Sequence, residues 1–408
     1  MYDLIVIGGG PAGMMGAATA GENGKKVLLL EKNAVLGKKL RITGNDRCNI
    51  TNSGPIDDFQ KNIINNGKFM YSSFATFDNV RLINLMRSLG VSMKVEKSNR
   101  VFPASDRSTD VVDALRRHLR ENNVEIRLNA AVKDVMVEGV RVSGVILKRG
   151  DSIKCSRVLL ATGGLSYRQT GSTGDGYRMA KMLGHSIIEP QPALAPLLTG
   201  ENWVKDLQGV TLENVKVRAA VGSRQARQQG DLLFTHFGLS GPVIINISSY
   251  LSRNATFPLE IKIDLLPHFS TEQLTERLYV CLEQNKGKYL KNVFGDLLPQ
   301  KMIPSIFEKA GLNQQKQVDQ AGRKDIDQLT RTIKSLTVIV DGFRPINEAI
   351  ITSGGIDTKE INPSTLESKM IKGLYFAGEI IDVDALTGGY NLQIAFSSGY
   401  LGGVSAAK

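Results

Sequence analysis

Glycines at a fixed spacing give the first chemical signal in this chain. Gly8, Gly10 and Gly13 follow a short apolar run and fit the pattern G-x-G-x-x-G, with Pro11 and Ala12 between the last two. The first glycine permits a tight turn, the second lets backbone approach a pyrophosphate, and the third lets a helix pack on the strand before it. The free N–H groups that begin such a helix attract phosphate.

An acidic residue completes this pattern. Glu31 ends a second apolar run eighteen residues after Gly13, where a carboxylate can accept hydrogen bonds from a ribose. The strand before the glycines, the helix after them and the acid at this distance together predict a βαβ unit that binds a dinucleotide.

Two later strands indicate which dinucleotide binds. Residues 157–161 read as a buried strand that ends at Thr162 and Gly163, and a small turn of this kind can pass close to a bound nucleotide. Another short strand ends at Gly378 and Glu379, which places a carboxylate where the ribitol hydroxyls of FAD would lie.

Gly389 and Asn391 begin the last helix, which we expect to end near residues 402–403. The N-terminus of that helix can point at the N1–C2=O edge of a flavin and stabilise its anionic reduced form. We therefore predict FAD as the cofactor.

The elements that must position these residues come from both ends of the chain. The pattern predicts an α/β protein with a Rossmann-type FAD-binding domain made of residues 1–190 and 340–408. Between them we expect a substrate domain with a β-rich part, residues 191–265, and a helical part, residues 266–339. Its strands are predicted at residues 214–221, 231–235, 255–263 and 336–340, and a hairpin of the first domain at residues 132–137 and 140–147.

Composition limits the class of protein further. The 408 residues include 51 Lys and Arg against 40 Asp and Glu, a net charge of +11 that favours anionic partners such as cofactor phosphates or RNA. Small basic groups, among them Lys38 and Lys39, read as solvated surface. Three separated cysteines and four scattered histidines predict neither a disulfide framework nor a metal site. The apolar start of the chain reads as a strand and no run is long enough to span a membrane, so we expect a cytoplasmic protein.

Three longer motifs narrow the class. They are residues 43–52 (TGNDRCNITN), residues 233–242 (LFTHFGLSGP) and residues 378–391 (GEIIDVDALTGGYN). Together they resemble the BaiN/RdsA family of bacterial flavoproteins over essentially the whole chain. Asp46 departs from the family pattern, which usually has glycine before the Arg-Cys-Asn triplet.

The resemblance implies a set of FAD contacts, which are Gly8, Gly10, Gly13, Glu31, Lys32, Arg47, Cys48, Asn49, Val132, Thr162, Gly163, Gly378, Glu379 and Asn391. The residue patterns alone agree on the glycines, on Glu31 and on the pair Gly378 and Glu379.

Four side chains are candidates for a catalytic or substrate-binding part. Arg47 could orient an anionic or carbonyl substrate or hold pyrophosphate, and Tyr390 could donate a proton or form a pocket wall. His236 could donate a proton or be a structural histidine. Cys48 has no second cysteine nearby, which rules out a dithiol mechanism and favours packing or cofactor contact.

Three functions compete at this point. The resemblance implies an FAD-dependent reductase of an activated C=C bond, either the enone of a 3-oxo-Δ4 bile acid or the uracil ring of ribosomal RNA. NAD(P)H would then be a transient reductant, because no second dinucleotide fingerprint is present. An oxidase of a small, aminoacetone-like amine that passes electrons to O2 is the second reading, and a flavin redox sensor or RNA-binding module is the third. The oligomeric state stays open.

Overall fold

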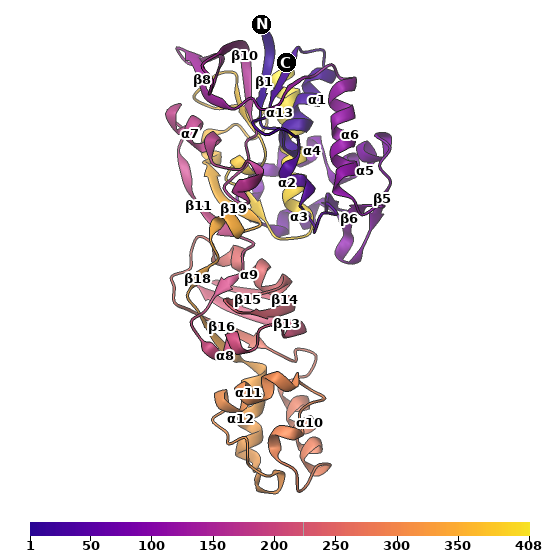
Figure 1. Cartoon of the computed structure of the whole chain (residues 1–408), viewed down its shortest axis with the longest axis vertical. Coiled ribbons are helices and arrows are strands. Elements are labelled where there is room, and N and C mark those ends of the chain that lie inside the picture. The colour runs from indigo at the N-terminus through magenta and orange to yellow at the C-terminus, as the bar shows by residue number, and fades with distance from the viewer. Residues whose placement is uncertain (223) are drawn as a thin grey trace. The chain divides into compact units, whose positions relative to one another are not determined.

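The computed structural model describes residues 1–222 and 224–408, with the Arg224 side chain left aside. The chain forms two compact units (Figure 1). We call Met1–Pro192 with Ile346–Lys408 the discontinuous unit, and Ala193–Pro345 the inserted unit.

A parallel sheet forms the centre of the discontinuous unit. Its strands lie in the order β7 (Glu125–Arg127), β2 (Val27–Leu30), β1 (Tyr2–Ile7), β10 (Ser152–Leu160) and β20 (Leu374–Phe376). All residues of β2 and β20 and the last four of β1 are buried, as expected of parallel strands that are covered on both faces. This architecture confirms the predicted α/β, Rossmann-type fold.

Different elements cover the two faces of this sheet. One core joins it to α1 (Pro11–Glu22), α6 (Ser108–Glu121) and α13 (Tyr390–Ala407). The other core includes α7 (Asp175–Met182) and the hairpin of β8 (Val132–Glu138) and β9 (Arg141–Leu147), which confirms the predicted hairpin. The remaining helices of the unit are α2 (Lys38–Arg41), α3 (Ile56–Asn62), α4 (Tyr71–Thr76) and α5 (Asn79–Ser88). Its smaller strands are β3 (Thr51–Asn52), β4 (Ile63–Asn65), β5 (Met93–Val95), β6 (Arg100–Pro103), β11 (Ile187–Ala193), β19 (Ile351–Ile356) and β21 (Asp384–Ala385).

Helices α1 and α13 approach each other closely through glycines. A Cβ on Gly399 would lie 2.3 Å from the oxygen of Ala12, and one on Gly403 would lie 2.5 Å from the oxygen of Gly16. The prediction that α13 ends near residues 402–403 is therefore wrong: these glycines make the helix contact, and the helix continues to Ala407.

An antiparallel sheet forms one side of the inserted unit, in the order β17-β16-β13-β14-β15-β12-β18. Its strands are β12 (Leu197–Leu198), β13 (Thr211–Val221), β14 (Arg224–Thr235), β15 (Gly238–Ser240), β16 (Leu259–Asp264), β17 (Leu336–Val340) and β18 (Gly342–Phe343). Its helices are α8 (Asn202–Asp206), α9 (Pro242–Leu251), α10 (Thr271–Glu283), α11 (Ile303–Lys309) and α12 (Arg323–Lys334). One hydrophobic core joins the sheet to these helices.

Strand β14 is longer than predicted. The sequence predicts a strand only at residues 231–235, but pairing with β13 extends it back to Arg224. Residues 224–230 are mostly polar, so periodicity alone does not reveal them. Among the described residues, no helix is both long and apolar enough to cross a membrane.

Candidate cofactor site

The turn between β1 and α1 forms an open cradle of backbone. Gly8 has φ +108°, and a Cβ on Gly13 would lie 1.9 Å from the oxygen of Gly8, so both positions require glycine. Gly10 differs, because a Cβ there would meet no described atom within 4 Å. Helix α1 begins after Gly10 with Pro11 at its first position and no side-chain cap in the described structure. This end of α1 can therefore receive a phosphate.

Glu31 lies beside this cradle, at the end of β2. Its buried carboxylate accepts hydrogen bonds from the N–H of Gly9 (2.7 Å) and from the N–H and Nδ2 of Asn33 (2.8 and 2.7 Å). The N–H of Ala130 donates to the backbone carbonyl oxygen of Glu31 at 2.9 Å. This bond brings the start of β8, with buried Val132, close to the end of β2. Lys32 instead contacts Thr173 (2.5 Å) and Asp175 (2.8 Å), so it ties this region to the start of α7.

A compact polar cluster surrounds Glu379, after β20. The Nζ of Lys39 lies 2.7 Å from its Oε2, while Ser166 Oγ (3.0 Å) and the N–H of Thr352 (2.9 Å) donate to Oε1. A Cβ on Gly164 would lie 2.9 Å from Glu379 Oε1, so this turn must carry glycine. The expectation that Lys39 is solvated surface is wrong, since its side chain is only 20% exposed and ion-paired.

Thr162 and Gly163 come directly before Gly164 in the chain. The Oγ1 of Thr162 is shielded from solvent and has no hydrogen-bond partner among the described atoms. Gly163 has φ +73°. The hydroxyl of Thr162 faces Gly176 of α7, where a Cβ would lie 2.0 Å from Thr162 Oγ1, so Gly176 must be glycine for α7 to approach this turn.

The loop of residues 43–52 packs on the start of α13. In the amide orientation that satisfies its neighbours, the Asn49 oxygen accepts from the N–H of Gly389 at 3.0 Å. Thr51 Oγ1 donates to Gln393 at 2.6 Å, and a Cβ on Gly389 would lie 2.3 Å from the carbonyl carbon of Thr51. Two motifs distant in sequence thus meet at one helix N-terminus.

Asn391 and Gly378 shape the backbone around that terminus. The Asn391 amide accepts from the N–H of Ala385 (2.9 Å) and donates to its oxygen (2.8 Å), so its side chain fixes the turn before α13. The N–H of Gly378 donates to Ser398 Oγ at 2.9 Å, and a Cβ on Gly378 would lie 2.8 Å from that of Ala12. The start of α1, the end of β20 and α13 therefore lie against one another.

The structure gives the candidate reactive residues distinct surroundings. Cys48 is fully buried, and burial raises its pKa to about 12, which keeps the thiol protonated at neutral pH. Tyr390 packs edge-on against Phe59 with ring centroids 5.0 Å apart, and burial raises its pKa. His236 lies in the inserted unit, exposed at the turn between β14 and β15.

Arg47 is paired rather than open to a ligand. Its guanidinium bonds to Glu96 and, at 2.7 Å through Nε, to Asp106, and it stacks on Phe102 at 4.3 Å. Its bond to Glu96 lowers the pKa of that carboxyl, and Lys94 and Arg47 together lower the pKa of Asp106. These contacts explain how Arg47 holds the residue 43–52 loop on β5 and β6.

Lys39, Ser166 and Thr352 are the site residues that the sequence analysis missed. Lys39 stands one residue from the exposed Lys38, and only the fold distinguishes the two. Ser166 and Thr352 lie 186 positions apart and carry no motif signal.

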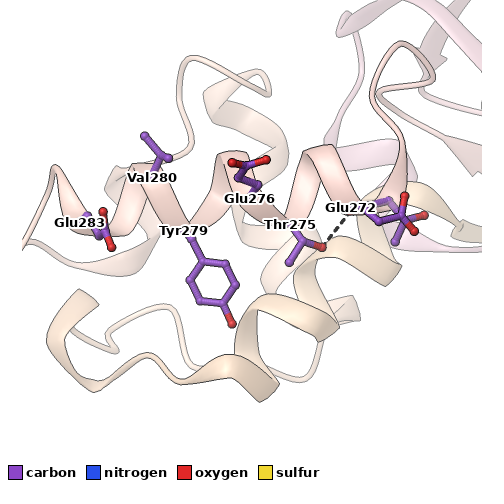
Figure 2. Close-up of a pocket in the computed structure, with 7 residues that line it drawn as sticks. Glu272, Thr275, Glu276, Tyr279, Val280 and Glu283 are labelled. Carbon is purple, nitrogen blue, oxygen red and sulfur yellow. Dashed lines mark hydrogen bonds between the residues drawn. The ribbon is translucent and has the colours of Figure 1, made fainter.

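A shallow pocket of about 530 Å³ lies elsewhere, along α10 of the inserted unit. Figure 2 shows its side chains spaced along the length of that helix, with the acids Glu272, Glu276 and Glu283 and the ring of Tyr279. Within the described residues, no group of three His, Cys, Asp or Glu side chains could hold a metal ion.

The fold and this site define the class of protein: a flavoprotein oxidoreductase with a Rossmann-type FAD-binding fold. The chain belongs to the HI0933-like Rossmann family, since residues 2–405 match the HI0933-like protein Rossmann domain. This match and the relatives below confirm the resemblance to the BaiN/RdsA family.

Two curated relatives align over nearly their full length. The chain is 30% identical to the 3-dehydro-bile acid delta(4,6)-reductase of Clostridium scindens, with 100% of both proteins covered. It is 31% identical to the ribosomal RNA dihydrouridine synthase of Escherichia coli, over 98% of this chain and 96% of that protein.

A solved structure supports the fold alone. The 3-ketosteroid-delta4-(5alpha)-dehydrogenase from Rhodococcus jostii RHA1 superposes with a TM-score of 0.53 at 15% identity, over 100% of this chain and 97% of that one.

Proposed function

We propose that this flavoprotein reduces a C=C bond conjugated to a carbonyl group, with NAD(P)H as the electron source. The observation that carries the proposal is the full-length similarity, at 30% and 31% identity, to two relatives named for reductions of this kind. An enone and a uracil ring share the feature that matters, a double bond activated by a neighbouring carbonyl. The two identities do not separate these substrates.

The residues of the discontinuous unit fit an FAD molecule. The open backbone at Gly10 and the uncapped start of α1 would hold the pyrophosphate, and Glu31 would accept hydrogen bonds from the adenosine ribose. Val132 would face the adenine, and the small turn at Thr162 and Gly163 would pass close to the cofactor. When bound, FAD supplies the hydride chemistry of the reaction.

The cluster around Glu379 would hold the ribitol end of the cofactor. Its carboxylate accepts hydroxyl donors, while Lys39 balances its charge in this partly buried position. The N-terminus of α13, set by Asn49 and Asn391, would stabilise negative charge at the N1–C2=O edge.

Tyr390 is the proton donor that we favour for the second step of the reduction. The half-buried Tyr390 stands at the start of α13, and its phenol is protonated at neutral pH like that of any tyrosine. Arg47, engaged by Glu96 and Asp106, would position the loop rather than the substrate. Cys48 would pack against the cofactor as a neutral thiol.

Anaerobic mixing of the purified yellow protein with NADH or NADPH tests the proposal. We expect the flavin absorbance to bleach, and then to return when an enone or a uridine-containing RNA is added. Failure of both nicotinamides to bleach the flavin would overturn the NAD(P)H-fed reductase. Bleaching by a small amine, with peroxide release in air, would assign an oxidase instead.

A further inference from the structure

A row of positive charges crosses one side of the inserted sheet. Arg218 on β13 lies directly opposite Arg227 on β14 and, on its other side, opposite Lys262 on β16. Directly opposite residues of an antiparallel pair point to the same face, and neighbouring strands are about 4.8 Å apart. Three cations therefore stand side by side on three consecutive strands.

This side of the sheet is the one that faces away from the unit's core. The alternate residues Val217, Ala219 and Ile261 are buried in that core, whereas Arg227 is exposed and the Lys262 side chain is 51% exposed. Exposed Lys216, two residues before Arg218, extends the row along β13. We call Lys216, Arg218, Arg227 and Lys262 the basic face.

Amides and few acids complete the surroundings. Gln225 and Gln229 on β14 lie on the same face, opposite Ala220 and Lys216. Glu260 is 3.2 Å from Lys262, and Asp264, opposite Lys216, is already paired with Lys334 at 2.7 Å. Exposed Asp231, two residues after Gln229 on β14, accepts from the N–H of Asn214, and Gln229 Nε2 donates to Asn214 Oδ1. The four cations of the basic face outnumber the three acids Glu260, Asp264 and Asp231, so the face keeps a net positive charge.

The arrangement is unfavourable for the isolated unit. Like charges placed directly opposite on neighbouring strands destabilise a sheet. In addition, the Nε of Arg218 is shielded from solvent and has no hydrogen-bond partner among the described atoms. A bound anion would offset the repulsion between these cations.

We propose that the basic face binds the phosphate backbone of RNA. Four cations spread over three strands exceed what a single phosphate would engage, but they match a chain of phosphates lying on a flat sheet. The amides of Gln225 and Gln229 can bond to ribose hydroxyls. The inference rests on the proposed function, because RNA would carry the uracil ring to be reduced.

The opposite charge lies on another surface of the same unit. Glu272, Glu276 and Glu283 follow one another along α10 and would repel a polyanion (Figure 2). RNA is therefore expected on the sheet rather than on α10.

Titration of a fluorescein-labelled, uridine-containing RNA hairpin with the FAD-loaded full chain tests this inference. Anisotropy is followed over a series of KCl concentrations, without reductant. The variant R218Q/R227Q/K262Q should bind at least about tenfold more weakly. The slope of its log binding constant against log [KCl] should become shallower by about 0.7 for each lost phosphate contact. The control K286Q/R323Q/K324Q removes the same charge from exposed positions outside the sheet and should bind like the wild type.

Equal losses in both triple variants would overturn the basic face, as would a wild type that binds no RNA. Preferential binding to phosphatidylserine vesicles would also overturn it, in favour of a membrane surface. The single variant R227Q serves if the triple variant fails to fold, since Arg227 is exposed. The binding titration involves no electron transfer, so it fails independently of the proposed reductase. A protein that reduces an enone but binds no RNA would contradict this inference alone. A protein that binds RNA but whose flavin is not bleached by NAD(P)H would contradict only the reductase.

Discussion

The candidate cofactor site of the discontinuous unit depends on glycines, whose lack of a side chain leaves the backbone open. The basic face of the inserted unit depends instead on side chains that strand pairing brings side by side. Gly8, Gly10 and Gly13 lie within six residues of one another, so their spacing is visible in the sequence. Arg218, Arg227 and Lys262 become neighbours only when three strands pair. A site made of backbone can thus be predicted from the local spacing of residues. A charged sheet face can be recognised only once the pairing of the strands is known.

The largest effect is expected from closing the glycine contact. Gly13→Ala places a methyl group 1.9 Å from the oxygen of Gly8 and should destabilise the fold by about 3 kcal/mol. Gly10→Ala meets no described atom within 4 Å, so it should leave thermal unfolding of the FAD-free protein unchanged and weaken FAD binding about tenfold. Calorimetry and FAD titration measure the two quantities, and equal unfolding temperatures for both variants would contradict this division of roles.

The next largest effect separates two adjacent lysines. Lys39→Met leaves the partly buried Glu379 carboxylate without its cation, so FAD binding should weaken about tenfold. Lys38→Met is the matched control, because Lys38 is exposed and its Nζ donates to the backbone oxygen of Gln169 at 2.7 Å. Lys39→Arg should restore most of the affinity. Similar FAD dissociation constants for the two Met variants would show that the Lys39 contact is incidental.

A pH dependence should follow from the buried thiol of the discontinuous unit. The pKa of Cys48 is about 12 in the folded protein and about 8.5 in an unfolded chain. Above about pH 8.5 the unfolded chain therefore releases a proton that the folded protein keeps. The free energy of unfolding is then unaffected by this thiol below about pH 8.5, and it declines by about 1.4 kcal/mol per pH unit as pH rises toward 12.

Urea unfolding at a series of alkaline pH values measures this dependence. The free energy of unfolding of Cys48→Ala should fall less steeply with pH than that of the wild type, by about one proton. Parallel profiles for the two proteins would mean that the thiol titrates alike in both states.

The smallest effect is expected in the inserted unit, where a substitution should raise the free energy of unfolding rather than lower it. Arg227→Gln removes one of two directly opposed guanidinium groups, so it should stabilise the RNA-free protein by about 0.5 kcal/mol at low salt. The gain should fade as salt screens the repulsion. Lys286→Gln, at an exposed position after α10, is the control. A loss of stability in Arg227→Gln would show that this arginine holds the sheet together.

These contrasts also explain what the sequence could predict. The α/β fold, the hairpin of β8 and β9 and the glycine turn follow from periodicity and local spacing. The pairing of Arg47 with Glu96 does not, because the two residues are 49 positions apart and nothing in the intervening sequence links them. The first half of β14, which carries Arg227, escaped prediction because its residues are nearly all polar.

The glycine contact between α1 and α13 affects the order in which the protein can fold during synthesis. Helix α1 leaves the ribosome early, yet its partner glycines, Gly399 and Gly403, are translated almost four hundred codons later. The inserted unit, whose core is continuous in sequence, can fold during this wait. Because the proposed FAD site includes the N-terminus of α13, we expect the cofactor to bind only after nearly the whole chain has been synthesised.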